Sequence, residues 1–242
     1  MDQWNRFELQ GINLPAIGIL IILLLSNCSG KKEMKEIVTS ITAEEMMDWT
    51  PLEKGKASVM GDMLVMEETD GSDGFFLISS GQLTGDYQID YDVKALSESS
   101  VLINLLNVTD TLGSDDFALP RAGSSPQEIW DWRSHLRHYN LTFNNRSHGI
   151  TPFFYKNHSP LSRGFYQKLS ANVMEPGQWF HVSIVKKGTE LKFMLNNNTY
   201  FDIMDYNPLD GGRLIFRVSG TTGENTILAK AAIKNLQITS WQ

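Results

Sequence analysis

The stretch from Gln127 to Asn140 carries most of the chemistry that this sequence offers. It holds two Trp, two His and two Arg residues, together with Glu128 and Asp131. Aromatic rings have flat apolar faces that suit the C–H surfaces of a sugar, and Arg, Asn, Asp and His can hydrogen-bond hydroxyl and carboxylate groups. The stretch therefore predicts a carbohydrate-binding surface. The alternative is one Trp in the core and a solvated strand edge.

The predicted surface extends beyond this stretch into two later arginines. Interpreted as a strand, the stretch places Trp130 and Trp132 on one face and Asp131 and Arg133 on the other. The substrate-binding residues that we predict are Trp130, Trp132, Arg137, His138, Tyr139, Arg146 and Arg163.

A lyase is an alternative chemistry for the same residues. It would need an Arg or another cation to neutralise a uronate carboxylate, and a Tyr or His to remove a proton. The catalytic candidates are Tyr139, His138 and Arg137, and His148 and Tyr166 offer similar groups. On a strand Arg137 and Tyr139 share one face and His138 takes the other, so only one base can lie beside Arg137.

The sequence predicts neither a glycosidase carboxylate pair nor a zinc site. Glycosidases need two carboxylates about 5 to 10 Å apart on one face, whereas Glu128 and Asp131 fall on opposite faces of a strand. His135 and His138 are three apart, which would align them on a helix but oppose them on a strand, and no ligand spacing completes a zinc site. A structural Ca²⁺ held by loop carbonyls and Asp115 or Asp116 stays open, because such sites leave little sequence trace.

Strands must position these residues, since period-two alternation dominates the chain. The clearest case is 86–93, which puts Tyr87, Ile89, Tyr91 and Val93 on one face and polar residues on the other. Further strands are expected at 59–67, 74–79, 101–108, 179–186, 190–196, 199–203, 212–218 and 229–239.

One short helix is expected at 42–47, where Thr42 and Glu45 have capping-box spacing. About a dozen strands without repeats predict an all-β fold, a jelly-roll sandwich of two antiparallel sheets.

Three motifs resemble those of the concanavalin A-like lectin/glucanase superfamily. They are 178–198 (QWFHVSIVKKGTELKFMLNNN), Asp202 and Asp205 followed by GGRLIFR at 211–217, and RHYNLTFNNR at 137–146. The last is similar to a stretch of the YesU-like bacterial family, found among pectin-degradation genes. The resemblance covers about residues 40–240 and implies glycan binding or processing. Laminarinase-like members carry Glu-x-Asp-x-x-Glu, but here Arg133 stands near the position of the second Glu.

Cys28, the single cysteine, follows an apolar run of about ten residues, Ala16 to Leu25. The run is too short to span a membrane, which needs about 20 helical residues, and it fits the apolar region of a secretory signal. A cysteine in this place resembles the lipobox of bacterial lipoproteins. The predicted division is a signal peptide at 1–27, a lipidated tether at 28–39 and a jelly roll at 40–242. The alternative is a plain secretory signal or an uncleaved anchor with Cys28 incidental.

The composition and net charge of the chain exclude some classes of partner and scaffold. The net charge is −7 and no basic field exists for nucleic acid, and a lone cysteine excludes a disulfide scaffold. We predict a protein that is lipid-anchored to a bacterial membrane in the cell envelope and binds, or helps process, an acidic polysaccharide or oligosaccharide without a cofactor. Acidic sugars are favoured because a guanidinium pairs with a carboxylate. The alternatives are a lyase or hydrolase, and a structural or adhesive module without a sugar site.

Overall fold

Strand β6 (Asp86–Ala95) shows how alternation builds the sandwich. Its residues Tyr87, Ile89, Tyr91 and Val93 are buried, while the residues between them are partly exposed. Successive side chains of a strand point to opposite faces, so one face of β6 packs in the core and the other meets solvent. The strand predicted at 86–93 is confirmed.

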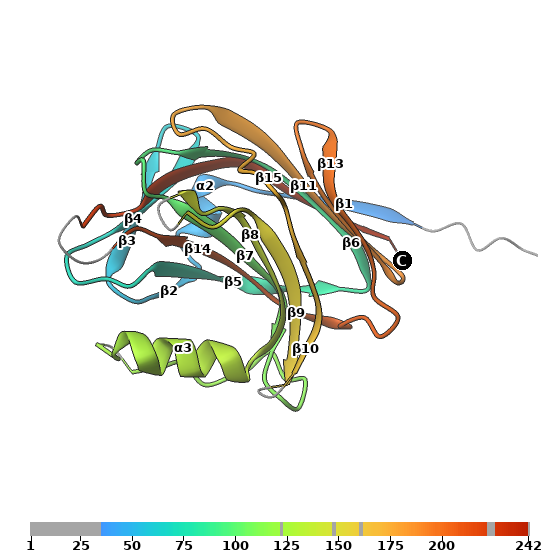
Figure 1. Ribbon diagram of the computed structural model, residues 1–242. Helices are drawn as coiled ribbons and strands as arrows, with labels where there is room; N and C mark the ends of the chain where they lie inside the picture. The colour runs from blue at the N-terminus through green and yellow to red at the C-terminus, as the bar shows by residue number, and fades with distance from the viewer. Residues whose placement is uncertain (1–34, 122, 147–148, 160–161, 222–225, 242) are drawn as a thin grey trace, which may run out of the picture. The chain divides into compact units, whose positions relative to one another are not determined.

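The computed structural model describes residues 35–121, 123–146, 149–159, 162–221 and 226–241. Within them the chain forms fifteen strands and two helices (Figure 1). Sheet A contains β1 (Glu36–Ile41), β3 (Gly55–Met60), β4 (Met63–Glu68), β6, β11 (Trp179–Lys187), β12 (Glu190–Leu195), β13 (Asn198–Met204) and β15 (Lys230–Trp241). Sheet B contains β2 (Thr50–Leu52), β5 (Phe75–Thr84), β7 (Val101–Thr109), β8 (Arg137–Asn144), β9 (Phe153–Ser159), β10 (Ser162–Lys168) and β14 (Gly211–Ser219).

The two sheets confirm the predicted jelly-roll class. Sheet A has the order β13-β12-β11-β6-β15-β4-β3, with β1 also paired to β15, and sheet B has the order β10-β9-β8-β7-β14-β5-β2. All these pairings are antiparallel. Neighbours in a sheet are often distant in sequence, as β7 and β14 are, which lets the sandwich bring remote segments to one face.

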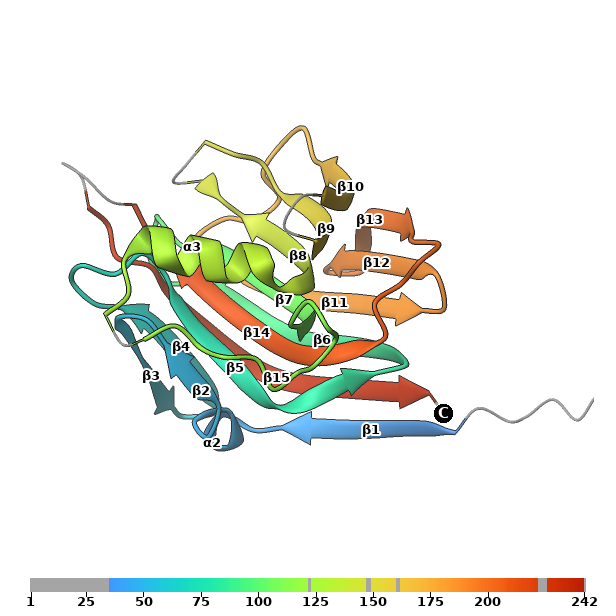
Figure 2. The ribbon, with the colours of Figure 1, turned by 90° about the horizontal axis from the view of Figure 1, so that it is seen from below.

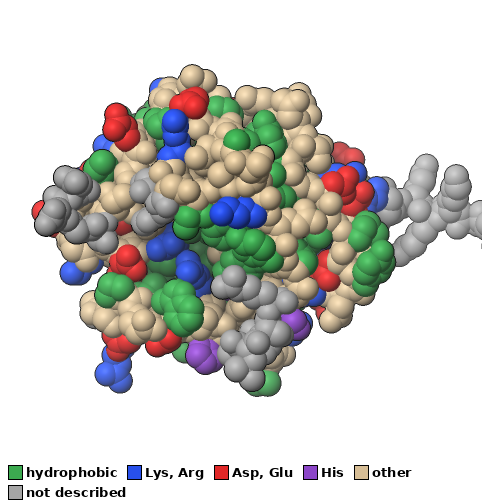
Figure 3. Space-filling view, in the orientation of Figure 1, with side chains coloured by type: hydrophobic (Ala, Val, Ile, Leu, Met, Phe, Trp, Pro, Cys, Tyr) green, Lys and Arg blue, Asp and Glu red, His purple; other side chains and the backbone are tan. Residues whose placement is uncertain are grey.

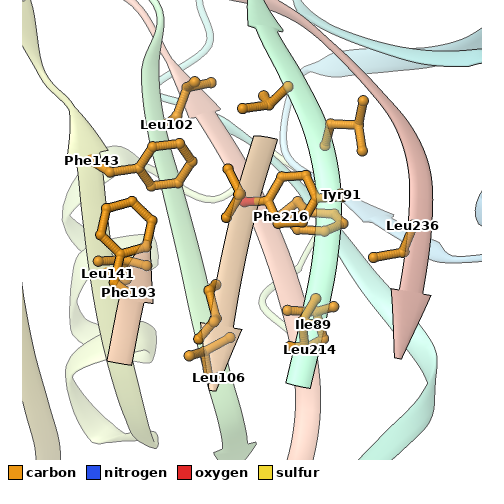
Figure 4. Packing of buried hydrophobic residues seen from close by; sticks show 14 of the residues in the cluster. Ile89, Tyr91, Leu102, Leu106, Leu141, Phe143, Phe193, Leu214, Phe216 and Leu236 are labelled. Carbon is orange, nitrogen blue, oxygen red and sulfur yellow. The ribbon is translucent and has the colours of Figure 1, made fainter. Parts of the chain in front are cut away.

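The main core lies between the two sheets, where aromatic rings of one sheet meet those of the other. Tyr91 of β6 lies 5.2 Å, centroid to centroid, from Phe216 of β14, and Phe143 of β8 lies 5.4 Å from Phe193 of β12 (Figure 4). Such aromatic pairs stabilise a core beyond the area that they bury.

Helix α2 (Ala43–Met46) confirms the predicted capping box. The backbone N–H of Glu45 donates to the Thr42 hydroxyl, and the backbone N–H of Thr42 donates to the Glu45 carboxylate. The two bonds satisfy N–H groups that have no partner inside the helix.

Helix α3 (Pro126–His135) corrects the strand interpretation of the Trp-rich stretch. Ser125 caps this helix: its hydroxyl accepts from the backbone N–H of Glu128 at 3.3 Å, and its backbone N–H donates to the Glu128 carboxylate at 2.7 Å. Pro126 occupies the first turn, where a missing N–H costs nothing. Glu128 therefore serves as a cap in this structure.

Two further segments differ from expectation. The strand predicted at 59–67 is the hairpin of β3 and β4, because Gly61, at φ 65°, turns the chain between them. β1 begins at Glu36, inside the segment 28–39 predicted as a tether, because Glu36 to Ile41 pair with β15. The predicted signal peptide and Cys28 lie outside the described residues. Among the residues that are described, no helix has the length and apolar character needed to cross a membrane.

Helix α3 lies on the face of sheet B that points away from the core (Figure 2). Strands β9 and β10 curve toward the level of the helix, which makes this face concave (Figure 1). Ile129 and Leu136 pack there in a second apolar cluster, which we call the helix cluster. Its other buried members are Leu52, Phe76, Ile78, Val101, Ile103, Leu105, Val108 and Ile215, with Phe117 and Trp132 packed against them.

A buried ion pair joins sheet B to the segment that follows β13. The Lys156 ammonium lies 2.9 Å from the Asp205 carboxylate, and both side chains are less than a tenth exposed. The Tyr139 hydroxyl and the Asn207 backbone N–H also donate to Asp205. Burial alone would raise the pKa of the Asp205 carboxyl, but the bonds from Lys156, Tyr139 and Asn207 outweigh it and lower that pKa below 3.8.

We expect Asp205→Asn to destabilise the fold by about 3–5 kcal/mol at neutral pH, because it leaves the Lys156 charge buried without a partner. A carboxyl whose pKa is lower in the folded state stabilises above its unfolded pKa, and this contribution is lost as pH falls through the folded pKa. Urea unfolding at pH 7 and at pH 3 therefore measures a gap between wild type and variant that shrinks in acid.

Glu67→Gln is the matched control for this prediction. Glu67 pairs with Lys230 at 2.9 Å on the surface, where both side chains are more than a quarter exposed. Its loss should cost less than about 1 kcal/mol. Equal costs for the two variants would contradict the assignment of Asp205 as a buried counter-ion.

Candidate functional site

A cavity of about 440 Å³ lies between α3 and the concave face of sheet B, within the ~300–1,000 Å³ range of small-molecule sites. Figure 3 shows a hollow on this side of the molecule, in which Lys or Arg side chains lie beside apolar ones. The cavity is lined by Asp73, Val101, Ile103, Trp130, Arg133, Asn140, Thr142, Asn145, Ile150, Phe153, Tyr155, Tyr166, Arg217, Ser219 and Gly220.

Three stacked rings form one wall of this cavity. Phe153 and Tyr155 are two residues apart on β9 and therefore share a face; their ring centroids lie 6.1 Å apart with planes at 15°. Tyr166 of β10 stacks on Phe153 at 6.0 Å. Tyr166 is 50% exposed, as is Trp130 of α3 at 53%, so both rings are open to a ligand. We call Phe153, Tyr155 and Tyr166 the aromatic wall.

Two arginines place positive charge in the same cavity. The Arg217 guanidinium lies 4.9 Å from the Phe76 ring centroid and donates to the Asp73 backbone carbonyl at 2.7 Å. Burial and the nearby charge of Arg133 lower the pKa of Arg217 to about 9, which still leaves it charged at neutral pH. No carboxylate of the described residues forms an ion pair with Arg133 or Arg217. The charges of Asp73, which also lines the cavity, and of Glu68 act on Arg217 from outside ion-pair distance and oppose the lowering of its pKa.

Unpartnered polar atoms also belong to side chains that line the cavity. Asn145 is 95% buried, and within the described part of the chain its Oδ1 has no hydrogen-bond partner, nor has Arg217 Nε. Asn140 accepts from the Thr142 hydroxyl at 3.0 Å through its own Oδ1, which leaves its amide group as a donor. A buried polar group without a partner costs about 1–3 kcal/mol, so a ligand with both acceptors and donors would gain from this site.

Of the predicted binding residues, Trp130 lines the cavity and Trp132 does not. Trp132 packs with Phe76 and Phe117, and its indole N–H donates to the Ala118 carbonyl at 2.9 Å. Arg146 forms an exposed ion pair with Glu175 and is absent from the cavity lining. Arg163 lies in β10 opposite Asn157, and its side chain lies outside what the structure describes.

The three catalytic candidates do not meet at a surface. The alternation predicted for β8 is correct, and it places Tyr139 in the core, hydrogen-bonded to Asp205 at 2.7 Å. His138 takes the opposite face but is 1% exposed, and burial together with the charge of Arg133 lowers its pKa to about 3. Arg137 starts β8 opposite Thr109 and does not line the cavity. A proton-abstracting centre built from these residues is therefore not formed.

The described residues contain no group of three or more His, Cys, Asp or Glu side chains that could hold a metal ion. Asp115, considered for a structural Ca²⁺, lies with its carboxylate 3.0 Å from Arg213 Nε. Its charge is therefore already paired with an arginine.

Comparison with solved structures gives a shared fold at low sequence identity. A Bacillus subtilis protein of unknown function with a galectin-like fold matches with a TM-score of 0.68 at 14% identity, over 86% of this chain and 98% of that one. A carbohydrate-binding module, CBM66 from B. subtilis, matches with a TM-score of 0.50 at 14% identity, over 80% of this chain and 98% of its own.

A Bacillus licheniformis β-glucanase also has a TM-score of 0.50, at 9% identity, over 76% of this chain and 81% of that one. These likenesses establish the fold alone. No protein-family model and no curated protein matches the sequence.

Sequence reasoning missed most of the cavity. Arg217, Asn145 and Tyr155 stand in separate strands or loops, and only the pairing of sheet B brings them together. The place of Arg133 beside Trp130 is predictable from the sequence, because Ser125, Pro126 and Glu128 form a signal for the start of a helix. A helical interpretation puts Trp130 and Arg133, three apart, on neighbouring positions of one face.

The two tryptophans of α3 should separate stability from binding. We expect Trp132→Ala to cost about 2 kcal/mol or more, since removal of a fully buried aromatic ring costs about 3–5 kcal/mol and Trp132 is partly buried. Trp130→Ala, at an exposed site, should stay within about 0.5 kcal/mol of wild type. Urea or thermal unfolding measures both, and a comparable loss for Trp130→Ala would place that ring in the core instead.

Proposed function

We propose that this protein is a glycan-binding module that holds an acidic sugar in the cavity between α3 and sheet B. The observation that carries the proposal is the pair Arg133 and Arg217, two guanidinium groups that line one cavity and form no ion pair with a carboxylate of the described residues. The charges of Asp73 and Glu68 act on Arg217 from outside ion-pair distance. The fold shared with a carbohydrate-binding module and a β-glucanase agrees with it.

The side chains that line the cavity suit both the ring and the carboxylate of a sugar acid. The aromatic wall and Trp130 offer ring faces for sugar C–H groups. A uronate carboxylate accepts hydrogen bonds from guanidinium groups, which are planar and can bind it with two parallel bonds. Asn140 and Asn145 then supply a donor and an acceptor for hydroxyl groups. Together these groups address both the charge and the ring of a uronic acid.

Binding without catalysis fits this site better than a lyase. The buried His138 is neutral, with its pKa lowered to about 3, and Tyr139 lies in the core. Tyr155 and Tyr166 remain as hydroxyl groups in the cavity, so the test must also follow chemistry. We expect retention on an acidic polysaccharide without new absorbance near 235 nm, where lyase products absorb, and without new reducing ends. Product formation would replace the proposal with an enzyme.

Arg133→Gln should weaken binding of an acidic glycan at least tenfold, because a hydrogen bond to a charged group contributes about 1.5–3 kcal/mol and 1.4 kcal/mol is a factor of ten. Affinity electrophoresis on pectic, algal and neutral polysaccharides identifies the retained glycan, and calorimetry then gives the dissociation constant. Wild-type affinity should also fall as salt rises.

Arg146→Gln is the matched control, since Arg146 pairs with Glu175 away from the cavity. Because Arg146 does not line the cavity, the variant removes the same charge and should leave the affinity within about twofold of wild type. Equal weakening by both variants would indicate a general charge effect, and retention on neutral glycans alone would contradict the acidic-sugar assignment. No retention on any glycan would favour a structural or adhesive module.

We further propose that Cys28 anchors the protein to the cell envelope, as its place after the apolar run suggests. A lipid chain on this cysteine would hold the sandwich at a membrane surface. In cells that express the full chain, Cys28→Ser should abolish incorporation of labelled fatty acid and move the protein from the membrane to the soluble envelope fraction. Unchanged labelling and fractionation would leave a plain secretory signal or an uncleaved anchor.

A further inference from the structure

The C-terminal end of α3 is hydrogen-bonded to sheet B on one side of the cavity. The Asn157 side-chain amide, from β9, donates to the backbone carbonyls of Ser134 at 2.9 Å and Leu136 at 2.6 Å. His138 Nδ1 lies 3.0 Å from the same Leu136 carbonyl. These contacts fasten the end of the helix to β8 and β9, and the helix therefore covers the sheet in that direction.

A second side of the cavity is closed by the helix cluster. Ile129 of α3 packs with Phe76 of β5, Leu105 of β7 and Ile215 of β14, all of them less than 4% exposed. Apolar side chains therefore fill the space between the helix and these strands. A chain of sugars cannot cross the concave face here, because interiors of this kind hold few voids larger than a water molecule.

The polar groups of the site line the cavity beside the part of sheet B that the helix covers. Arg133 comes from the helix, Arg217 from β14 and Asn145 from the position directly after β8, and each lines the same cavity. The exposed rings of Trp130 and Tyr166 lie at its rim. Its volume of about 440 Å³ is in the lower part of the ~300–1,000 Å³ range for small ligands.

We infer that the site reads the end of an acidic glycan chain, holding one or two terminal residues, and does not bind the interior of a chain. This inference rests on the proposed function. A terminal uronate enters the cavity with its carboxylate on Arg133 and Arg217, and the rest of the chain extends out of the cavity past Trp130 and Tyr166. An internal residue would need space on both sides, and α3 removes that space on one of them.

The test is a calorimetric series on the full domain with galacturonate oligomers from the monomer to the hexamer. We expect the affinity per chain to change by no more than about threefold between dimer and hexamer, since residues beyond the second make no further contacts. One protein molecule should bind per chain. A gain of about tenfold or more from dimer to hexamer, or several protein molecules on one long chain, would overturn the chain-end mode.

Modified ends sharpen this test. Borohydride turns the reducing-end residue into an open alditol, whereas lyase digestion leaves an unsaturated ring at the non-reducing end. A site that holds one end should lose about tenfold in affinity for one of these two hexamers and little for the other, because buried polar groups are then left unpaired. Equal affinity for both modified hexamers and the native one would overturn the proposal.

The Arg133→Gln variant distinguishes a failure of the chain-end mode from a failure of the acidic-glycan site itself. Binding that grows with chain length, yet is weakened at least tenfold by Arg133→Gln, would overturn the chain-end mode and leave an acidic-glycan site. If neither the wild type nor the Arg146→Gln control binds any galacturonate or alginate oligomer, the acidic-glycan site and the chain-end mode fall together.

Discussion

The structure of the site depends on one constraint: the outer face of sheet B is apolar over β5, β7 and β14 and must be covered. Phe76, Ile103, Leu105 and Ile215 would otherwise face water, and burying one such side chain contributes about 1.5–3 kcal/mol. Helix α3 supplies the cover. A single helix thereby turns an open concave face into a bounded cavity.

The rotation of that helix about its axis determines which of its side chains pack on the sheet and which line the cavity. Ile129 and Trp132, three apart in the helix, pack on the sheet, and so does Leu136, the residue that follows the helix. Trp130 and Arg133 each follow a packed residue by one position, which is about 100° around the helix axis. They line the cavity instead. One short stretch therefore supplies both the residues that hold the helix on the sheet and the residues that line the cavity, which explains why Trp and Arg lie so close together in it.

Sequence reasoning recovers the sheets far better than the site, for a physical reason. The period of two in β6, and the capping box of α2, are local patterns that the final structure keeps. The Trp-rich stretch has local signals too, but a strand predicts alternating faces where Ser125 and Glu128 in fact begin a helix. A helix gives every side chain of this stretch neighbours that differ from those of a strand. Arg217 and Asn145 give no local signal at all, because their proximity arises from strand pairing across sheet B.

The residues of β8 that look most catalytic contribute by holding the scaffold of the site. The Tyr139 hydroxyl donates to Asp205 and accepts from the Leu209 backbone N–H at 2.8 Å. Lys156 of β9 pairs with the same Asp205. These bonds fix the segment between β13 and β14 where the chain passes from sheet A to sheet B, and β14 then carries Arg217 to the cavity. The buried pair of Lys156 and Asp205 thus helps to position the strand that carries Arg217 into the cavity.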